Sequence, residues 1–202
     1  MIKKGCEQMG NAHKKILSLC SGTGAWEKPY FENGYDVYSI TLPENDVRIY
    51  VPPENVYGIL AAPVCTMFSL ARTRAKTPRD FRQGMELVIA CLNIIWNCRY
   101  DNKLKFWCME NPMGYLRQFM GKPIFTFDPC DFGENYTKKT DLWGYFNIPK
   151  KKPYILTLEE KYLCSQNSRK LPNISGIKGS RQKARRAITP PGFAQAFFDS
   201  NR

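Results

Sequence analysis

The chain has 202 residues, of which 30 are Lys or Arg, 18 are Asp or Glu and 43% are hydrophobic, so its formal net charge is +12. This length leaves no room for two well-packed domains, and residues 1–202 are expected to form one. The hydrophobic content excludes an intrinsically disordered chain. The positive excess indicates a polyanionic partner such as nucleic acid, although charge that only aids solubility gives the same composition.

Apolar segments and cysteines exclude further classes of protein. Residues 1–15 are polar, unlike a secretory signal, and no apolar window is long enough to span a membrane. We therefore expect a cytoplasmic protein without a membrane partner. The eight cysteines form no Cys-x-x-Cys pair and the chain has one histidine, so no metal site is expected.

The first predicted unit is a strand, a glycine turn, a helix and a second strand. The strand covers residues 15–20 and runs into Ser21-Gly22-Thr23-Gly24. A helix is expected over 25–33, ended by Gly34, and a strand over 35–41, which requires a parallel crossover. Such a turn lets backbone amides approach a ligand at a helix N-terminus, but a tight turn without a ligand has the same sequence.

A third strand over 57–61 leads into Pro63-Val64-Cys65, and a basic loop over 72–79 precedes a long helix over 81–98. A cysteine at a strand end, close to the arginines of that loop, has the exposure and positive surroundings that favour a thiolate. The alternative is a buried structural cysteine.

A fourth strand over 104–109 closes on Glu110-Asn111-Pro112. An acid after an apolar strand is either a paired structural charge or a proton-handling group with a raised pKa. The alternation of strands and helices predicts an α/β fold with an open, doubly wound, mostly parallel sheet. Since ligands gather at the carboxyl ends of such strands, the glycine turn, Cys65 and Glu110 are expected to meet at one edge.

The C-terminal third is less regular. Residues 147–186 form a basic, loop-rich segment, followed by a short helix that Thr189 would cap and Pro190 would begin. Part of this segment is expected either to contact phosphates or to be a solvated loop. The cations concerned are Lys178, Arg181, Lys183, Arg185 and Arg186.

Taken in order, these motifs resemble those of the cytosine-5 DNA methyltransferase family, in a compact, phage-like form. The turn 20–24 (CSGTG) is similar to the family's Phe-x-Gly-x-Gly cofactor turn, with Cys20 at the phenylalanine position. Residues 63–69 (PVCTMFS) are similar to its Pro-Cys-Gln-x-Phe-Ser catalytic loop, and Glu110-Asn111-Pro112 to its Glu-Asn-Val motif. Residues 189–194 (TPPGFA) are similar to its C-terminal cofactor segment, so the resemblance covers most of the chain.

The resemblance implies the fold and chemistry of an S-adenosylmethionine-dependent methyltransferase that modifies carbon 5 of cytosine in DNA. Cys65 would be the nucleophile of a covalent adduct and Glu110 the catalytic acid. The implied cofactor residues are Cys20, Ser21, Gly22, Thr23, Gly24, Asp46, Pro63 and Phe193. The implied substrate residues are Pro63, Ser69, Asn111, Lys138, Arg181 and Arg185.

The sequence departs from the family in three places. Thr41 stands where an acid normally ends the second strand and holds the cofactor ribose, and Glu44 is the nearest replacement. Residues 136–140 (YTKKT) are nearest to the Gln-x-Arg-x-Arg strand, with Lys138 at the base-contacting position. Residues 147–186 stand in place of a target-recognition domain. This predicts a target of about two to three bases, or modification with almost no sequence context, because each discriminated pair needs roughly 1–3 kcal/mol of contact.

Two other functions are compatible with these motifs. The same chemistry could act on RNA or a free nucleotide, or use a modified methyl donor. A catalytically silent nucleic-acid-binding protein could also use this fold, although the retention of Cys65 and Glu110 argues against it.

Overall fold

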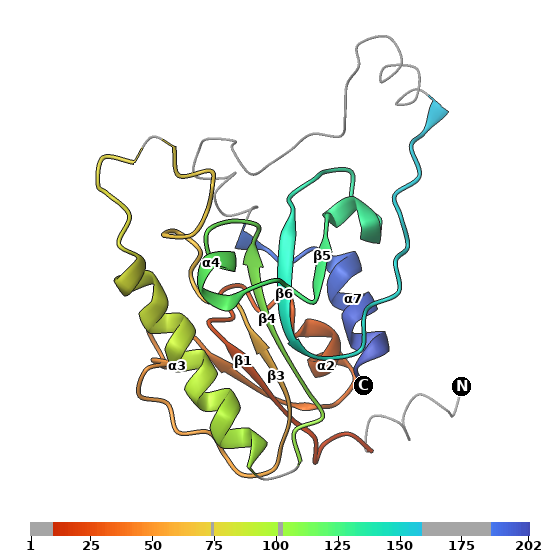
Figure 1. Ribbon diagram of the computed structural model, residues 1–202. Helices are drawn as coiled ribbons and strands as arrows, with labels where there is room; N and C mark the ends of the chain where they lie inside the picture. Colours follow the sequence, from red (N-terminus) through yellow and green to blue (C-terminus); the bar gives the residue numbers. More distant parts are fainter. Residues whose placement is uncertain (1–9, 74, 101–102, 159–186) are drawn as a thin grey trace.

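The computed structural model describes residues 10–73, 75–100, 103–158 and 187–202. Within them, a six-stranded sheet of order β2-β1-β3-β4-β6-β5 lies between helices (Figure 1). The strands are β1 (Lys15–Leu19), β2 (Asp36–Ile40), β3 (Val56–Ala61), β4 (Phe106–Pro112), β5 (Phe125–Phe127) and β6 (Thr140–Tyr145). The helices are α2 (Lys28–Glu32), α3 (Phe81–Arg99), α4 (Arg117–Met120), the 3-10 helix η1 (Pro129–Phe132) and α7 (Pro191–Ser200).

The sheet is mostly parallel, which confirms the predicted α/β class. Neighbouring strands among β1 to β4 pair in parallel, whereas β6 is antiparallel to both β4 and β5. The chain moves from β1 outward to β2 and then returns to the other side of β1 as β3. The strand order therefore reverses between β1 and β3, and the crevice at their carboxyl ends is the place where ligands bind in open α/β sheets.

Alternate residues of the strands build two cores, one on each face of the sheet. Leu17 and Ile59 pack with the apolar face of α3. Ile16 and Leu60 point the other way and pack with α2 and α7. The helices thus cover opposite faces of the sheet, α3 on one side and α2 with α7 on the other (Figure 1).

The structure confirms the long helix and shortens the one before it. Helix α3 begins at Phe81 as predicted, because the Asp80 carboxylate accepts a hydrogen bond from the Gln83 amide at 2.9 Å. Helix α2 begins at Lys28 instead of residue 25 and has Pro29 in its first turn, where a missing amide hydrogen costs nothing. It ends before Gly34, as predicted, and that glycine has a φ of +76°.

Strand β4 extends past the predicted end at residue 109, because β6 continues the pairing. Glu110 lies opposite Leu142 and Asn111 opposite Asp141, after the parallel partner β3 has ended at Ala61. The sequence predicted that Glu110 follows the strand. In the structure Glu110 is instead part of β4. The sequence analysis did not predict β5 and β6, because their apolar runs are short.

The C-terminal helix begins one residue later than expected. Pro190 is the N-cap of α7, with no side-chain cap, so the prediction that Thr189 caps this helix is wrong. Residues 146–157 have no regular secondary structure. Asn147 is held by the end of α7, since its amide donates to Asn201 Oδ1 at 2.7 Å and its carbonyl accepts from Asn201 Nδ2 at 3.0 Å. Among the described helices, none is long and apolar enough to cross a membrane.

Candidate functional site

Residues 62–70, here named the Cys65 loop, leave β3 at the reversal of strand order. Pro63 is buried and Cys65 is partly exposed. The Cys65 carbonyl accepts hydrogen bonds from the amides of Phe68 at 3.0 Å and Ser69 at 2.9 Å, which closes a turn directly after the cysteine. Phe68 is fully buried against Phe81 and Phe119 and anchors this turn in the core.

The end of β4 is fastened to the Cys65 loop at several points. The Asn111 side chain is fully buried, and its Nδ2 donates to the Pro63 carbonyl at 2.9 Å. Further along, the Tyr115 amide donates to the Phe68 carbonyl at 2.9 Å. Gly114 allows this approach, because a Cβ there would lie 2.3 Å from the Phe68 carbonyl oxygen. The two motifs separated in sequence are thus one structural unit.

Glu110 precedes the anchoring asparagine and has a perturbed carboxyl group. Burial raises its pKa, the charge of Lys138 acts in the opposite direction, and the charge of Asp141 adds to the increase. The carboxyl is therefore biased toward its protonated form, in which it can donate a hydrogen bond. Lys138 lies two residues before β6, within the electrostatic reach of Glu110.

Asp141 is a buried charge of β6 that binds side chains of α4 and β5. Its two oxygens accept from Arg117 Nε and Nη2, both at 2.6 Å, and Thr126 Oγ1 donates to it at 2.7 Å. A bidentate pair of this kind compensates a fully buried carboxylate. Asp141 also lies opposite Asn111 in the register of the two strands.

The glycine turn follows β1 at the same edge of the sheet. Cys20, Gly22 and Gly24 have φ values of +57°, +61° and +73°. Glycine adopts this conformation freely, but Cys20 is an uncommon residue there. Its amide donates to the Ile40 carbonyl at 2.8 Å, and a hydrogen bond with the Cys91 thiol of α3 lowers the pKa of Cys20.

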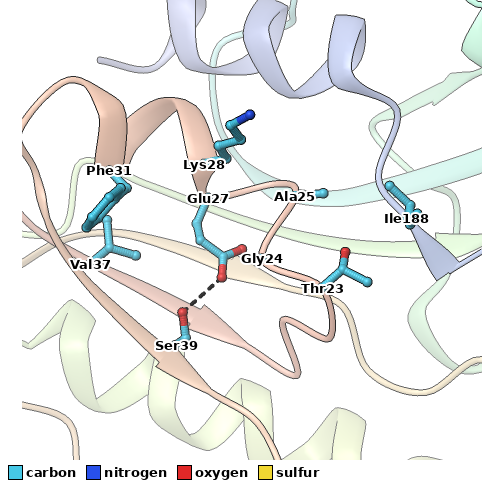
Figure 2. A pocket seen from close by; sticks show the side chains of 9 residues that line it. All are labelled: Thr23, Gly24, Ala25, Glu27, Lys28, Phe31, Val37, Ser39 and Ile188. Carbon is cyan, nitrogen blue, oxygen red and sulfur yellow. Dashed lines mark hydrogen bonds between the residues drawn. The ribbon is translucent and has the colours of Figure 1, made fainter.

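A cavity of about 600 Å³ lies between this turn, α2 and β2 (Figure 2). Phe31 and Val37 lie at one end of it, and Thr23 and Ile188 at the other. Its surface is mostly apolar, with a carboxylate in the middle. The lining residues are Thr23, Gly24, Ala25, Glu27, Lys28, Phe31, Val37, Ser39 and Ile188.

Glu27 supplies this carboxylate, and the sequence analysis did not identify it. The residue is only 4% exposed, and its oxygens accept hydrogen bonds from Ser18 Oγ and Ser39 Oγ, both at 2.9 Å. A carboxylate has about four acceptor positions, and the hydrogen bonds from the described residues occupy two of them. Gly24 leaves room beside it, since a Cβ there would be 3.4 Å from Glu27 Oε1. The sequence feature that could have indicated a buried polar partner was a serine in each of two strands, Ser18 in β1 and Ser39 in β2.

Among the expected cofactor residues, Thr23 and Gly24 line the cavity and two others have different surroundings. Phe193 is fully buried and stacks on Phe127, with 4.1 Å between ring centroids, so its side chain is part of the core, and its cofactor role stays a prediction. Asp46 is bound by the Arg48 guanidinium and amide, and these hydrogen bonds lower its pKa to about 2.

Of the other residues that the sequence predicted for the site, Ser69 lies in the Cys65 loop and Glu44 does not line the cavity. Ser69 is partly buried in the Cys65 loop, and its Oγ accepts from the Ala71 amide at 3.2 Å. Glu44 is exposed and is not among the residues that line the cavity. Arg181 and Arg185, with the rest of the basic cluster, lie outside the described residues.

In the ranges that the structure describes, no group of three or more His, Cys, Asp or Glu side chains is placed to hold a metal ion. The candidate site consists of the Cys65 loop, the end of β4 and the glycine turn with its cavity. No known protein-family model matches the chain, and no curated protein matches it significantly.

Proposed function

We propose that this protein is an S-adenosylmethionine-dependent methyltransferase that modifies carbon 5 of cytosine in DNA, with Cys65 as nucleophile and Glu110 as acid. The observation that carries the proposal is the hydrogen bond from Asn111 to Pro63, which joins the two motifs at the carboxyl edge of the sheet. A partly exposed cysteine and a carboxyl with a raised pKa, held in one structural unit, are the groups that this chemistry requires.

The cavity at the glycine turn fits the proposed cofactor. Its volume of about 600 Å³ lies in the range of small-molecule sites, and its apolar wall suits a nucleoside base. The acceptor oxygens of Glu27 suit hydroxyl or ammonium groups. Thr23 and Gly24 would hold the part of the ligand next to the turn. When bound, S-adenosylmethionine supplies the methyl group that carbon 5 of the base receives.

The protein's own groups account for the activation of the base. The Cys65 thiolate forms a bond to carbon 6, and the electron pair displaced from the ring is stabilised when Glu110 gives its proton to N3. This makes carbon 5 nucleophilic. After methylation, water takes the carbon 5 proton, the electron pair of that bond restores the double bond between carbons 5 and 6, Cys65 leaves as thiolate, and N3 returns its proton to Glu110. Covalent attack thus divides one difficult substitution into easier steps.

DNA as the substrate is supported by the net charge of +12 and by the placement of Lys138 near Glu110. A base must leave the helical stack, or already be single-stranded, before it can reach a cysteine at a strand end. RNA, a free nucleotide and a modified donor use the same residues, so they are distinguished by product analysis.

Mass spectrometry of nucleosides from the DNA and RNA of cells that express the protein tests this proposal. The expected result is 5-methylcytosine in DNA from cells with the wild type and none above background with Cys65→Ala. Modification in RNA alone, or an added mass other than one methyl group, would change the substrate or donor. Absence of any modified nucleoside, with pure protein failing to bind S-adenosylhomocysteine, would reject the methyltransferase.

A further inference from the structure

Arg79 connects three segments around the Cys65 loop. Its Nη1 donates to the Met67 carbonyl at 2.8 Å, and its Nη2 donates to the Ser69 carbonyl at 2.9 Å. The guanidinium carbon lies 4.8 Å from the centre of the Tyr115 ring, which belongs to the segment after β4. Arg79 itself directly precedes Asp80, the N-cap of α3.

Two of the carbonyls that Arg79 binds belong to the turn that follows the cysteine. The amides of Phe68 and Ser69 bond to the Cys65 carbonyl, and the Ser69 carbonyl accepts a second bond, from the Arg72 amide at 3.3 Å. Arg79 bonds to the Met67 and Ser69 carbonyls with one planar group, and its Nη2 makes a longer bond, of 3.4 Å, to the Arg72 carbonyl. The opposite side of the turn is fixed by α3, because a Cβ at Gly84 would lie 2.9 Å from the Phe68 ring.

We infer that Arg79 is a positioning residue for Cys65. Its guanidinium group binds two carbonyls of one turn and lies over the Tyr115 ring, and it thereby fixes the backbone that carries the thiol. The inference rests on the proposed role of Cys65 as nucleophile. Lysine cannot replace this arginine, because an ammonium group lacks the planar fork that reaches two acceptors and stacks on a ring. A displacement of about 1 Å at a nucleophile can lower a rate by roughly a hundredfold.

The test compares wild type with Arg79→Lys and with a matched control, Arg82→Lys, at an exposed arginine in the first turn of α3. Two quantities are measured. The first is the rate at which Cys65 forms a covalent adduct with DNA that contains 5-fluorocytosine, with S-adenosylmethionine present. The second is hydrogen exchange of the Phe68 and Ser69 amides in the protein alone. Affinity for S-adenosylhomocysteine and the Tm serve as measures of general damage.

For Arg79→Lys, we expect adduct formation to slow by about 10- to 100-fold and both amides to exchange at least about tenfold faster. Affinity for S-adenosylhomocysteine is expected to stay within about twofold of wild type, and Arg82→Lys to match wild type throughout. Tyr115 gives a second pair of variants in case Arg79→Lys fails to fold. Tyr115→Phe keeps the ring and is expected to behave as wild type, whereas Tyr115→Leu is expected to slow the adduct as Arg79→Lys does.

Unchanged adduct rates in Arg79→Lys, with wild type forming the adduct, would overturn the inference and leave the proposed function intact. A wild type that forms no adduct would reject the proposed function instead. If the wild type forms no adduct, the amide exchange still decides whether Arg79 holds the turn. Phe68 and Ser69 amides that exchange in Arg79→Lys at the wild-type rate would overturn the inference about Arg79.

Discussion

Asn111 donates from Nδ2 to the carbonyl oxygen of Pro63 at 2.9 Å, across 48 residues of sequence. The donor is fully buried at the end of β4, and the acceptor begins the loop that carries Cys65. This bond and the one from the Tyr115 amide to the Phe68 carbonyl join the two motifs on which the proposed chemistry depends. Loss of the bond from Asn111 would therefore affect both stability and activity.

Asn111→Ala should destabilise the protein by about 1–3 kcal/mol, because the Pro63 carbonyl loses its buried donor. Activity should fall further than stability explains, since the Cys65 loop loses its bond to the residue next to Glu110. Urea unfolding and kcat/KM measured on the same preparation check this prediction. Asn97→Ala, at an exposed position of α3, is the control and should change stability by no more than about 0.5 kcal/mol. An Asn111→Ala variant with wild-type kcat/KM would contradict the proposed coupling.

Glu110→Gln should abolish most turnover while leaving the protein at least as stable as wild type at neutral pH. A carboxyl whose pKa is raised on folding stabilises the native state below its unfolded pKa and loses that contribution as pH rises through the folded pKa. Glutamine has no such loss, so the stability of the variant relative to wild type should increase from pH 4 to pH 7.5. Urea unfolding at both pH values measures it, with Glu86→Gln, an exposed glutamate of α3, as control. Equal pH dependence in wild type and Glu110→Gln would be inconsistent with a raised pKa.

Lys138→Met should raise the pKa of Glu110 further, because the lysine charge opposes the effect of burial. The limb of the kcat/KM profile that reports Glu110 should then move to higher pH. Lys139→Met is a matched control, since Lys139 is exposed and the neighbouring lysine carries the effect on Glu110. A profile that shifts equally in both variants would point to general charge instead of a specific effect on Glu110.

Glu27→Gln should weaken binding of S-adenosylhomocysteine by about tenfold, equivalent to about 1.4 kcal/mol, because the cavity loses its acceptor charge. Isothermal titration calorimetry measures the change. Glu32→Gln, at an exposed glutamate of α2 that pairs with Lys28, should bind as wild type. If Glu27→Gln kept full affinity with a lower Tm, the carboxylate would only join β1 to β2.

The sequence predicted the parts of the fold that depend on local patterns. Periodic apolar residues located α3 within one residue at its C-terminal end, and Gly34 marked the end of α2. The sequence also predicted that the glycine turn, Cys65 and Glu110 meet at one edge, because parallel strands bring their carboxyl ends together. These features need no knowledge of distant contacts.

Contacts between distant segments were not predictable in the same way. Ser18, Glu27 and Ser39 form one cluster across three elements, and each is unremarkable in its own segment. Phe193 lies in a motif that resembles a cofactor segment, yet aromatic packing against Phe127 places it in the core. Arg79 belongs to a basic loop, and only the folded turn shows three carbonyls, of Met67, Ser69 and Arg72, converging on it.

The central claim is that Cys65 forms the covalent bond to the base. A DNA duplex with 5-fluorocytosine, S-adenosylmethionine and the purified protein should give a stable protein–DNA adduct, because fluorine cannot leave as the carbon 5 proton does. Peptide mass spectrometry should then locate the adduct on Cys65, and Cys65→Ser should form none. An adduct on Cys20, Cys130 or any other cysteine, or methyl transfer by Cys65→Ser at the wild-type rate, would contradict the claim.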